Sequence, residues 1–307
     1  MTVTRESPDG VLLLDKPEGL SSTQALGRSK RLLAARKAGH TGTLDPFATG
    51  LLPLAFGEAT KFSRFLIDSR KSYRATLRLG VESTTGDTEG ILSSPKPVSA
   101  HYQEIDDVLV DFAGVSTQIP PMHSAVHHGG KRLYELAREG IEVEREPRRI
   151  EIHELLREHF EGDRLVISVT CSKGTYIRTL AADIGRALGC GAYLVALRRT
   201  AVGRFRLDEA VGLEALERAG VEGARARLLP VEVLVEELPR CNPAAADALR
   251  FTQGQVIDWP GAATGSEWAV RGPAGTFLGV GRAESAGRLA PLRLMATTQS
   301  ANLPDFA

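Results

Sequence analysis

GHTGTLDPFATGLL, residues 39–52, is the stretch around which the rest of this sequence is organised. It holds three glycines, three threonines, one proline, one histidine and a single carboxylate, that of Asp45. Glycine and Asp-Pro pairs favour turns, and small neighbours let another molecule come close to the carboxylate. We therefore expect a shaped loop that presents Asp45. An Asp-Pro pair found in isolation is more often only a structural turn.

The composition is that of a globular protein. A chain of 307 residues with 42% hydrophobic content can form one large domain and a small one. No stretch approaches the roughly 20 apolar residues of a membrane span, and residues 1–9 are too polar for a signal peptide, so we expect a cytoplasmic protein. Cys171, Cys190 and Cys241 form no CxxC pair, which argues against a disulfide framework and a zinc site.

Positive charge is clustered, although 38 basic and 38 acidic residues balance overall. The segment that precedes the central stretch carries bases without acids, at Arg28, Lys30, Arg31, Arg36 and Lys37, and further clusters occur at 148–149, 198–199 and 204–206. Such clusters beside a glycine-rich loop can bind the phosphates of a nucleic acid. Solvated helix faces would give the same pattern.

Hydrophobic periodicity predicts a mixture of strands and helices. Strands are expected at 10–14, 73–79, 149–157, 164–171 and 193–200, and helices from 22 to before 39 and at 105–112, 131–138 and 177–188. The segment 86–100 indicates a loop.

Arg178 falls in the first turn of the last predicted helix. A helix dipole favours acidic groups at that end, so an acidic partner or a phosphate is the natural explanation for an arginine there, with a surface arginine of no special role as the alternative. His123, His127 and His128 lie among glycines and bases without the spacing of metal ligands, which favours a mobile binding loop over a metal site.

Five ordered runs resemble the bacterial TruB family of tRNA pseudouridine-55 synthases. They are LLLDKPEGLSS (12–22), GHTGTLDPFATGLLP (39–53), KSYRATLRLG (71–80), IPPMHSAVHHGGKRLYELAREG (119–140) and CSKGTYIRTLAADIG (171–185). The resemblance implies an α+β fold around a mixed sheet in residues 1–237, with an RNA-clamping insertion at 118–149. Residues 238–296, with glycine turns between short strands, resemble a PUA-type RNA-binding barrel, and 297–307 is expected to be a tail.

The same resemblance implies an isomerase that converts a uridine of the tRNA T-loop to pseudouridine. Asp45, Tyr73 and Arg178 would be catalytic, with His40 beside the target nucleotide, Tyr176 and Leu197 lining the pocket, and Lys16, Arg36 and Lys37 also binding substrate. An arginine beside Asp45 would lower the pKa of its carboxyl group. Which group removes the carbon-5 proton stays open between Asp45, Tyr73 through a water, and another base.

The implied partner is the T-stem-loop of tRNA, bound by a monomer without a membrane. We expect phosphate contacts from the basic helix at 28–37, which includes Arg36 and Lys37, and from the 198–199 pair. We expect no metal or other cofactor, because no Walker loop or dinucleotide fingerprint occurs. Two other functions compete with this one. A hydrolase would pair Asp45 with Asp87 or Asp183, and an RNA chaperone would bind tRNA without chemistry.

Overall fold

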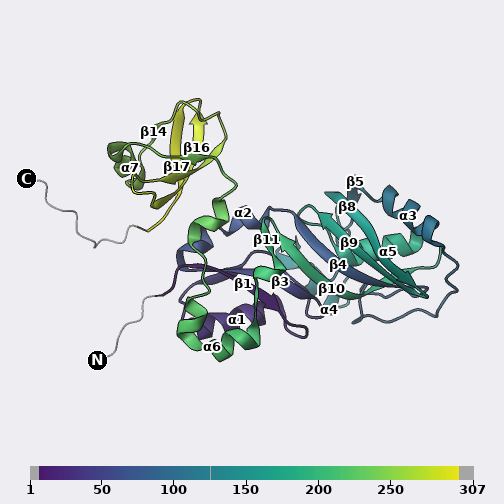
Figure 1. The fold of residues 1–307 in the computed structure, drawn as a ribbon. Helices are drawn as coiled ribbons and strands as arrows, with labels where there is room; N and C mark the ends of the chain where they lie inside the picture. Colours follow the sequence, from purple (N-terminus) through teal and green to yellow (C-terminus); the bar gives the residue numbers. More distant parts are fainter. Residues whose placement is uncertain (1–6, 125, 297–307) are drawn as a thin grey trace, which may run out of the picture.

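The structure, a computed structural model, describes residues 7–124 and 126–296. A ten-stranded mixed sheet forms the larger part of it (Figure 1). Its strands follow the order β12-β1-β3-β10-β4-β9-β8-β5, with β11 paired to β10 and β2 paired to β3. The fold class is therefore α+β, as expected.

The strands of this sheet confirm those expected from the sequence and add others. They are β1 (Gly10–Lys16), β2 (Ala38–His40), β3 (Thr49–Phe56), β4 (Lys71–Leu79), β5 (Gly114–Gln118), β8 (Arg148–Glu161), β9 (Arg164–Cys171), β10 (Ala192–Val202), β11 (Phe205–Arg206) and β12 (Val211–Gly212). Strands β2 and β3 take both ends of the stretch 39–52, which was expected to be a single loop, and leave 41–48 as the loop. β3 is buried along almost its whole length, so its apolar run lacks the alternation that marks a half-buried strand.

Helices and short 3₁₀ segments pack on this sheet. They are α1 (Ser22–Leu32), α2 (Ser63–Ile67), α3 (Tyr102–Asp111), α5 (Ile177–Ala187), α6 (Leu213–Arg225), η1 (Gly57–Lys61), η2 (Leu207–Glu209) and η3 (Val231–Val235). A capping box fixes the start of α1: the Ser21 side chain accepts from the Gln24 amide at 3.2 Å, and the Gln24 side chain accepts from the Ser21 amide at 2.8 Å.

Helix α1 ends earlier than the sequence pattern predicts. Ala34 has a φ of 52°, in the left-handed region where helices stop. Arg36 and Lys37 were expected on the helix, but they lie in the link that follows it and leads into β2. The helical setting predicted for these two residues is therefore wrong.

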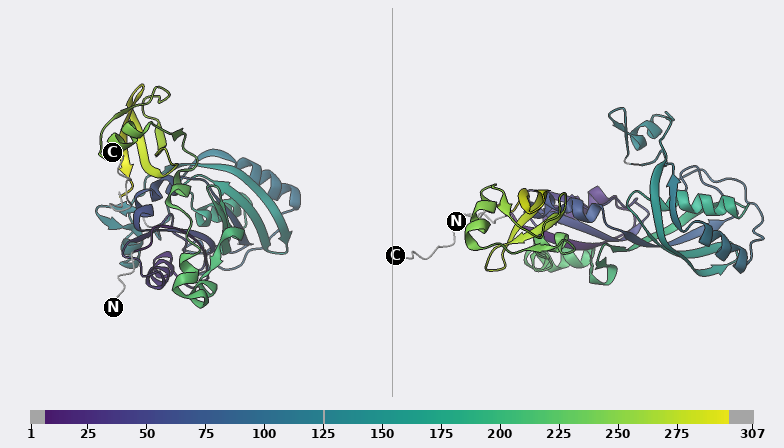
Figure 2. Two further views of the ribbon diagram at one scale, coloured as in Figure 1. Left: turned by 60° about the vertical axis from the view of Figure 1, so that its left-hand side comes forward. Right: turned by 90° about the horizontal axis from the view of Figure 1, so that it is seen from above.

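A hairpin and a short helix project from the body in the right-hand view of Figure 2. The hairpin pairs β6 (His127–His128) with β7 (Lys131–Arg132), and α4 (Leu133–Arg138) follows at once. This helix was predicted from the sequence. Among the described residues, no helix is long and apolar enough to cross a membrane.

The C-terminal part forms its own five-stranded sheet beside α2 (Figure 1). It contains β13 (Arg240–Cys241), α7 (Ala245–Thr252), β14 (Ile257–Asp258), β15 (Glu267–Arg271), β16 (Phe277–Ser285) and β17 (Arg288–Leu294). Phe62 and Phe277 meet edge to face across the junction, with ring centroids 5.2 Å apart. Arg64 and Glu267 form an ion pair at 2.8 Å beside them. An aromatic contact in a shared apolar cluster therefore joins the two parts.

Phe62→Ala should lower the free energy of unfolding by about 3–5 kcal/mol, because the ring is fully buried and its loss leaves a cavity at the junction. Leu249→Ala is the control, since Leu249 is 60% exposed and its loss should change stability by no more than about 0.5 kcal/mol. Urea unfolding followed by circular dichroism measures both. Equal effects of the two changes would contradict the packing described for Phe62.

Candidate active site

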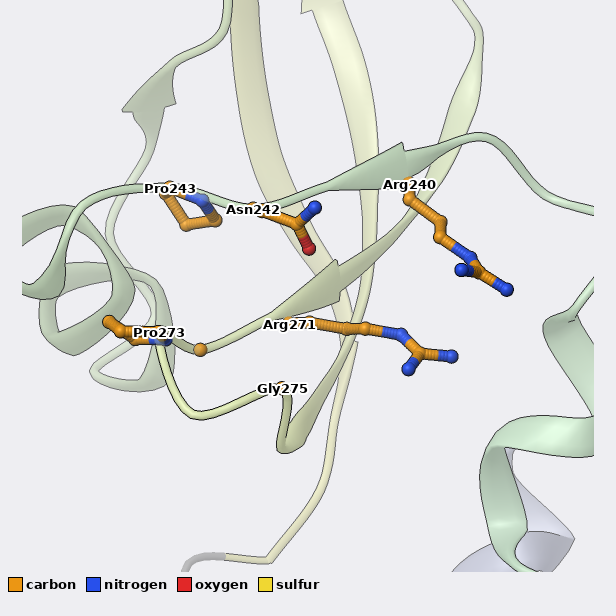
Figure 3. A pocket seen from close by; sticks show the side chains of 7 residues that line it. Arg240, Asn242, Pro243, Arg271, Pro273 and Gly275 are labelled. Atoms are coloured by element: carbon orange, nitrogen blue, oxygen red, sulfur yellow. The ribbon is translucent and has the colours of Figure 1, made fainter.

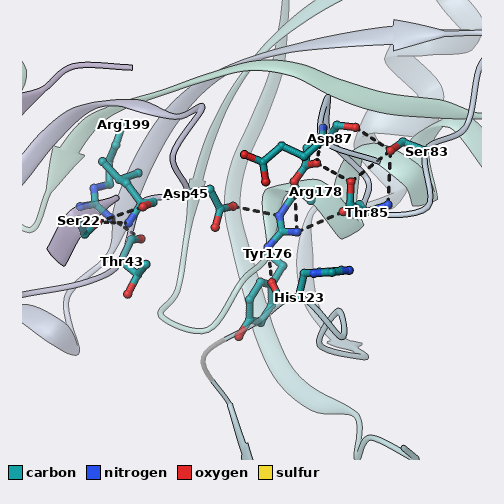
Figure 4. A network of polar contacts seen from close by, with 12 residues as sticks. Ser22, Thr43, Asp45, Ser83, Thr85, Asp87, His123, Tyr176, Arg178 and Arg199 are labelled. Carbon is teal, nitrogen blue, oxygen red and sulfur yellow. Dashed lines mark hydrogen bonds and ion pairs between the residues drawn. The ribbon is translucent and has the colours of Figure 1, made fainter. Parts of the chain in front are cut away.

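Asp45 lies in the loop 41–48 and faces the first turn of α5 (Figure 4). Its Oδ2 is 3.0 Å from Nε of Arg178. The Arg178 side chain is 6% exposed, whereas that of Asp45 is 34% exposed. The carboxylate can therefore be reached from outside while the arginine that holds it cannot.

Four acceptors fix the guanidinium of Arg178. Besides Asp45, its Nη1 lies 3.3 Å from Oδ2 of Asp87 and 3.2 Å from the carbonyl of Thr85. Its Nη2 donates to the carbonyl of His123 at 2.7 Å. A buried cation is tolerated when its donors are satisfied in this way, and acidic partners also suit the N-terminal end of α5. An acidic partner was expected for Arg178, and the structure places two acids beside it, Asp45 and Asp87.

Asp87 is enclosed, with 2% exposure. Its Oδ1 accepts from the amide of Glu89 at 3.0 Å and from the hydroxyl of Thr85, while its other oxygen faces Arg178. Asp183 lies elsewhere and pairs with Arg186 at 2.7 Å. Neither arrangement supplies Asp45 with the accessible second acid that a hydrolase would use.

Burial raises the pKa of the Asp45 carboxyl above its ordinary value. The Arg178 guanidinium lowers that pKa, Asp87 raises it, and the ammonium of Lys16 lowers it. The sequence argument expected the arginine to dominate. Its effect has the expected sign, but desolvation outweighs it, so the net direction is upward.

Lys16 is fully buried, and its Nζ donates to the carbonyls of Leu20 at 2.6 Å, Pro17 at 2.9 Å and Pro46 at 3.3 Å. Burial lowers the pKa of this lysine to about 8. The expected direct contact with substrate does not fit this position. Lys16 instead ties the turn after β1 to the residue that follows Asp45.

Tyr73 is half-buried on β4, and burial raises the pKa of its phenol, against the lowering influence of Arg199. The phenol is therefore neutral at physiological pH. His40 ends β2 at the entrance to the loop of Asp45, and Leu197 on β10 is 8% exposed.

Tyr176 is held through its backbone by Gln118, the last residue of β5. Its amide donates to Oε1 of Gln118 at 2.8 Å, and its carbonyl accepts from Nε2 of Gln118 at 3.2 Å. No motif in the sequence points to Gln118. Tyr176 and Arg178 come from the same chain segment, so this clamp also fixes the start of α5.

The basic residues divide into paired and unpaired ones. Arg28 binds Glu217 through two bonds of 2.9 and 2.7 Å, and Arg198 binds Asp15 at 2.7 Å. Arg199 is 1% exposed, so the phosphate contact expected from the 198–199 pair is wrong for this residue. Arg36 and Lys37 are exposed, and in the described part of the chain their side chains have no partner.

Within residues 7–124 and 126–296, no group of three or more histidines, cysteines and acids is arranged to hold a metal ion.

Replacing Arg178 by methionine should raise the pKa of Asp45 further, because methionine keeps the site filled and dry while removing the positive charge. Titration of the carboxyl carbon of Asp45 by NMR measures this shift. Arg186→Met is the matched control, since Arg186 pairs with Asp183 instead. An Asp45 titration that is the same in both variants would show that Arg178 does not govern the carboxylate.

Comparison with known proteins identifies the family. Residues 30–177 match the TruB family pseudouridylate synthase (N terminal domain), 178–236 match the tRNA pseudouridylate synthase B C-terminal domain, and 239–295 match the pseudouridine synthase II TruB C-terminal domain. A tRNA pseudouridine synthase B of Aromatoleum aromaticum is 52% identical over 97% of this chain and 96% of its own. A protein of the same name from Dechloromonas aromatica is 51% identical over 94% and 95%.

Solved structures agree with these matches. A Cbf5-Nop10-Gar1 complex superposes with a TM-score of 0.71 at 28% identity, covering 91% of this chain and 79% of the other. An H/ACA RNP bound to a substrate RNA containing 2'-deoxyuridine gives a TM-score of 0.71 at 25% identity, covering 93% and 84%. The protein belongs to the TruB family and is a pseudouridine synthase, an isomerase that acts on RNA.

Proposed function

We propose that this protein converts uridine 55 in the T-loop of tRNA to pseudouridine, with Asp45 as the catalytic carboxylate. The observation that carries the proposal is the position of Asp45 on a loop, open to solvent on one side and held by the buried Arg178 on the other. The relatives of this protein that are named tRNA pseudouridine synthase B support tRNA as the substrate.

The reaction moves one bond of the base. The bond between N1 of uracil and C1' of the ribose breaks, the base turns over, and a bond from C5 to C1' forms. The C5 proton then leaves, while N1 gains a proton, so no net oxidation occurs. Asp45 serves either as the nucleophile or as the anion that stabilises the positive charge developing in the cleavage.

The target base must leave its stack, which costs a few kcal/mol. Stacking on an aromatic side chain returns about 1–3 kcal/mol per base. Tyr73 offers a neutral ring for this purpose, and His40 stands at the entrance to the loop of Asp45. We assign base stacking to Tyr73, a position beside the nucleotide to His40, and the pocket wall to Tyr176 and Leu197.

The projecting segment is proposed to clamp the T-loop over residues 118–149. Arg148 and Arg149 at its end are exposed and suited to phosphates. At its base, the carbonyl of His123 and the side chain of Gln118 bind Arg178 and Tyr176. Contacts of this segment with RNA would thus be linked directly to the site.

A second contact with tRNA is proposed for the C-terminal domain, residues 238–296. A cavity of about 510 Å³ on it is lined by Arg240, Asn242, Pro243, Arg271, Gly272, Pro273 and Gly275. The two arginine side chains extend in the same direction (Figure 3), although Arg271 also lies 3.4 Å from Glu232. Two family matches meet between 236 and 239, which supports the boundary. We also propose a monomer working in the cytoplasm.

Asp45→Asn should abolish conversion and leave tRNA affinity within several-fold of wild type, because the carboxylate acts at the sugar whereas affinity comes mainly from basic residues. Tritium release from tRNA labelled at carbon 5 of uridine measures conversion, and filter binding measures affinity. A transcript with cytidine at position 55 is the control for the site.

Release of tritium from that transcript would contradict uridine 55 as the target. An active Asp45→Asn variant would contradict Asp45 as the catalytic carboxylate. A wild-type protein that binds tRNA without release would be a chaperone.

Arg36→Gln combined with Lys37→Gln should weaken tRNA binding and reduce the slope of log affinity against log salt by roughly 1–2 units, since each neutralised phosphate contributes about 0.7–0.9. Turnover at saturating tRNA should stay near wild type. The control also removes two positive charges, from Arg28 and Arg186, whose side chains are already paired with acids. A slope unchanged by the first pair would move the phosphate contacts to another face.

A further inference from the structure

Arg199 on β10 is a fully enclosed arginine that no motif singles out as more than a basic neighbour of Arg198. It is 1% exposed. Its Nε donates to the carbonyl of Leu51 at 2.7 Å, and its Nη2 donates to the carbonyl of Gly42 at 3.1 Å. Its Nη1 donates to the carbonyl of Thr43 at 3.4 Å (Figure 4). Gly42 and Thr43 precede Asp45 within the loop 41–48, and Leu51 follows the loop on β3, so these carbonyls lie on both sides of Asp45 in the chain.

The partners of Arg199 are unusual for a buried cation. In the described part of the chain it forms no ion pair, and its hydrogen bonds go to neutral groups, three backbone carbonyls and the phenol of Tyr73. Burial of a charge without an opposite charge is costly, and an apolar side chain of similar volume is often at least as stabilising. Stability alone therefore does not account for Arg199.

The backbone of Arg199 is also in close contact with the loop. It pairs with Gly50 in the short parallel contact of β10 with β3. Gly50 has a φ of +103°, and a Cβ there would lie 2.4 Å from the carbonyl oxygen of Arg199. Only glycine lets the two chains approach so closely.

Tyr73 faces Arg199 on the other side. The two residues are direct partners in the antiparallel pairing of β10 with β4. The guanidinium also lowers the pKa of the Tyr73 phenol against the effect of burial. One side chain thus lies between the loop that carries Asp45 and the aromatic ring assigned to base stacking.

We propose that Arg199 is a positioning residue, which ties the two ends of the Asp45 loop together and holds the carboxylate against Arg178 beside Tyr73. It acts through the carbonyls of Gly42, Thr43 and Leu51 and does not touch Asp45. The proposal rests on the catalytic role proposed for Asp45. A lysine cannot replace Arg199, because one ammonium group cannot donate to carbonyls on both sides of Asp45 as a planar guanidinium does.

Arg199→Lys tests the proposal because it keeps the charge and removes the fork. We expect kcat for tritium release to fall by about 100-fold, the loss typical of a misplaced catalytic group, with tRNA affinity close to wild type. The acidic limb of the pH profile of kcat should move to higher pH, since a carboxylate that drifts away from Arg178 has a higher pKa. Arg74→Lys is the matched control, on the neighbouring strand, exposed and paired with Glu158, and it should change neither quantity.

A double-mutant cycle separates positioning from general damage. If Arg199 acts through the contact of Asp45 with Arg178, Arg199→Lys should reduce kcat far less in the Arg178→Met background than in wild type.

Gly50→Ala is a second test, which does not depend on the folding of Arg199→Lys. It keeps every catalytic side chain and should shift the acidic limb of the pH profile in the same direction. Additive losses, or a pH profile unchanged in the folded variants, overturn the proposal. A wild type that releases no tritium would instead overturn the proposed function, and the positioning role with it.

Discussion

The contact of Asp45 with the buried guanidinium of Arg178 is the interaction on which the site depends. A cation in the first turn of α5 opposes the helix dipole and loses its water, so it is tolerable only among acceptors. Asp45, Asp87 and the carbonyls of Thr85 and His123 supply them. Segments distant in the sequence must therefore meet at Arg178, and the fold brings Asp45 to the arginine.

The carboxylate is poised by two opposing influences. Burial makes its charged form costly, and Arg178 with Lys16 makes that form favourable. A carboxylate exposed to water would keep its ordinary pKa and would be only weakly basic. Burial and Arg178 act on the charged form of Asp45 in opposite directions, which suits the role proposed for it, to react with the sugar or to stabilise a developing cation.

Much of the site is predictable because its residues lie in distinctive local patterns. The single acid of 39–52 and the arginine at the start of a helix are visible in the amino-acid sequence alone, and they point to Asp45 and Arg178. Long periodic elements such as α5 and β4 are predictable for the same reason. The end of α1 is not predictable, because Ala34 adopts a left-handed conformation that is rare for alanine.

Arg199 and Lys16 show where sequence reasoning fails. The cluster of basic residues assigns Arg199 to phosphates because such residues are usually exposed, and the family resemblance assigns Lys16 to the substrate. The strand predicted at 193–200 holds a clue, since successive side chains of a strand point to opposite faces. Of two adjacent arginines on it, one has to point inward, and the structure assigns that position to Arg199. For Lys16 no such clue exists, because its carbonyl partners are set by tertiary contacts.

The hydrogen bond from Arg178 to the carbonyl of His123 joins the buried cation beside Asp45 to the projecting segment. If the segment clamps RNA as proposed, the shape of the bound RNA would adjust one of the four acceptors of that cation. An RNA with the wrong loop geometry would leave the segment displaced and Arg178 short of an acceptor, with Asp45 less well held. Selectivity would then be exercised after binding, in the rate of the chemical step, so that poor substrates are bound and released unchanged.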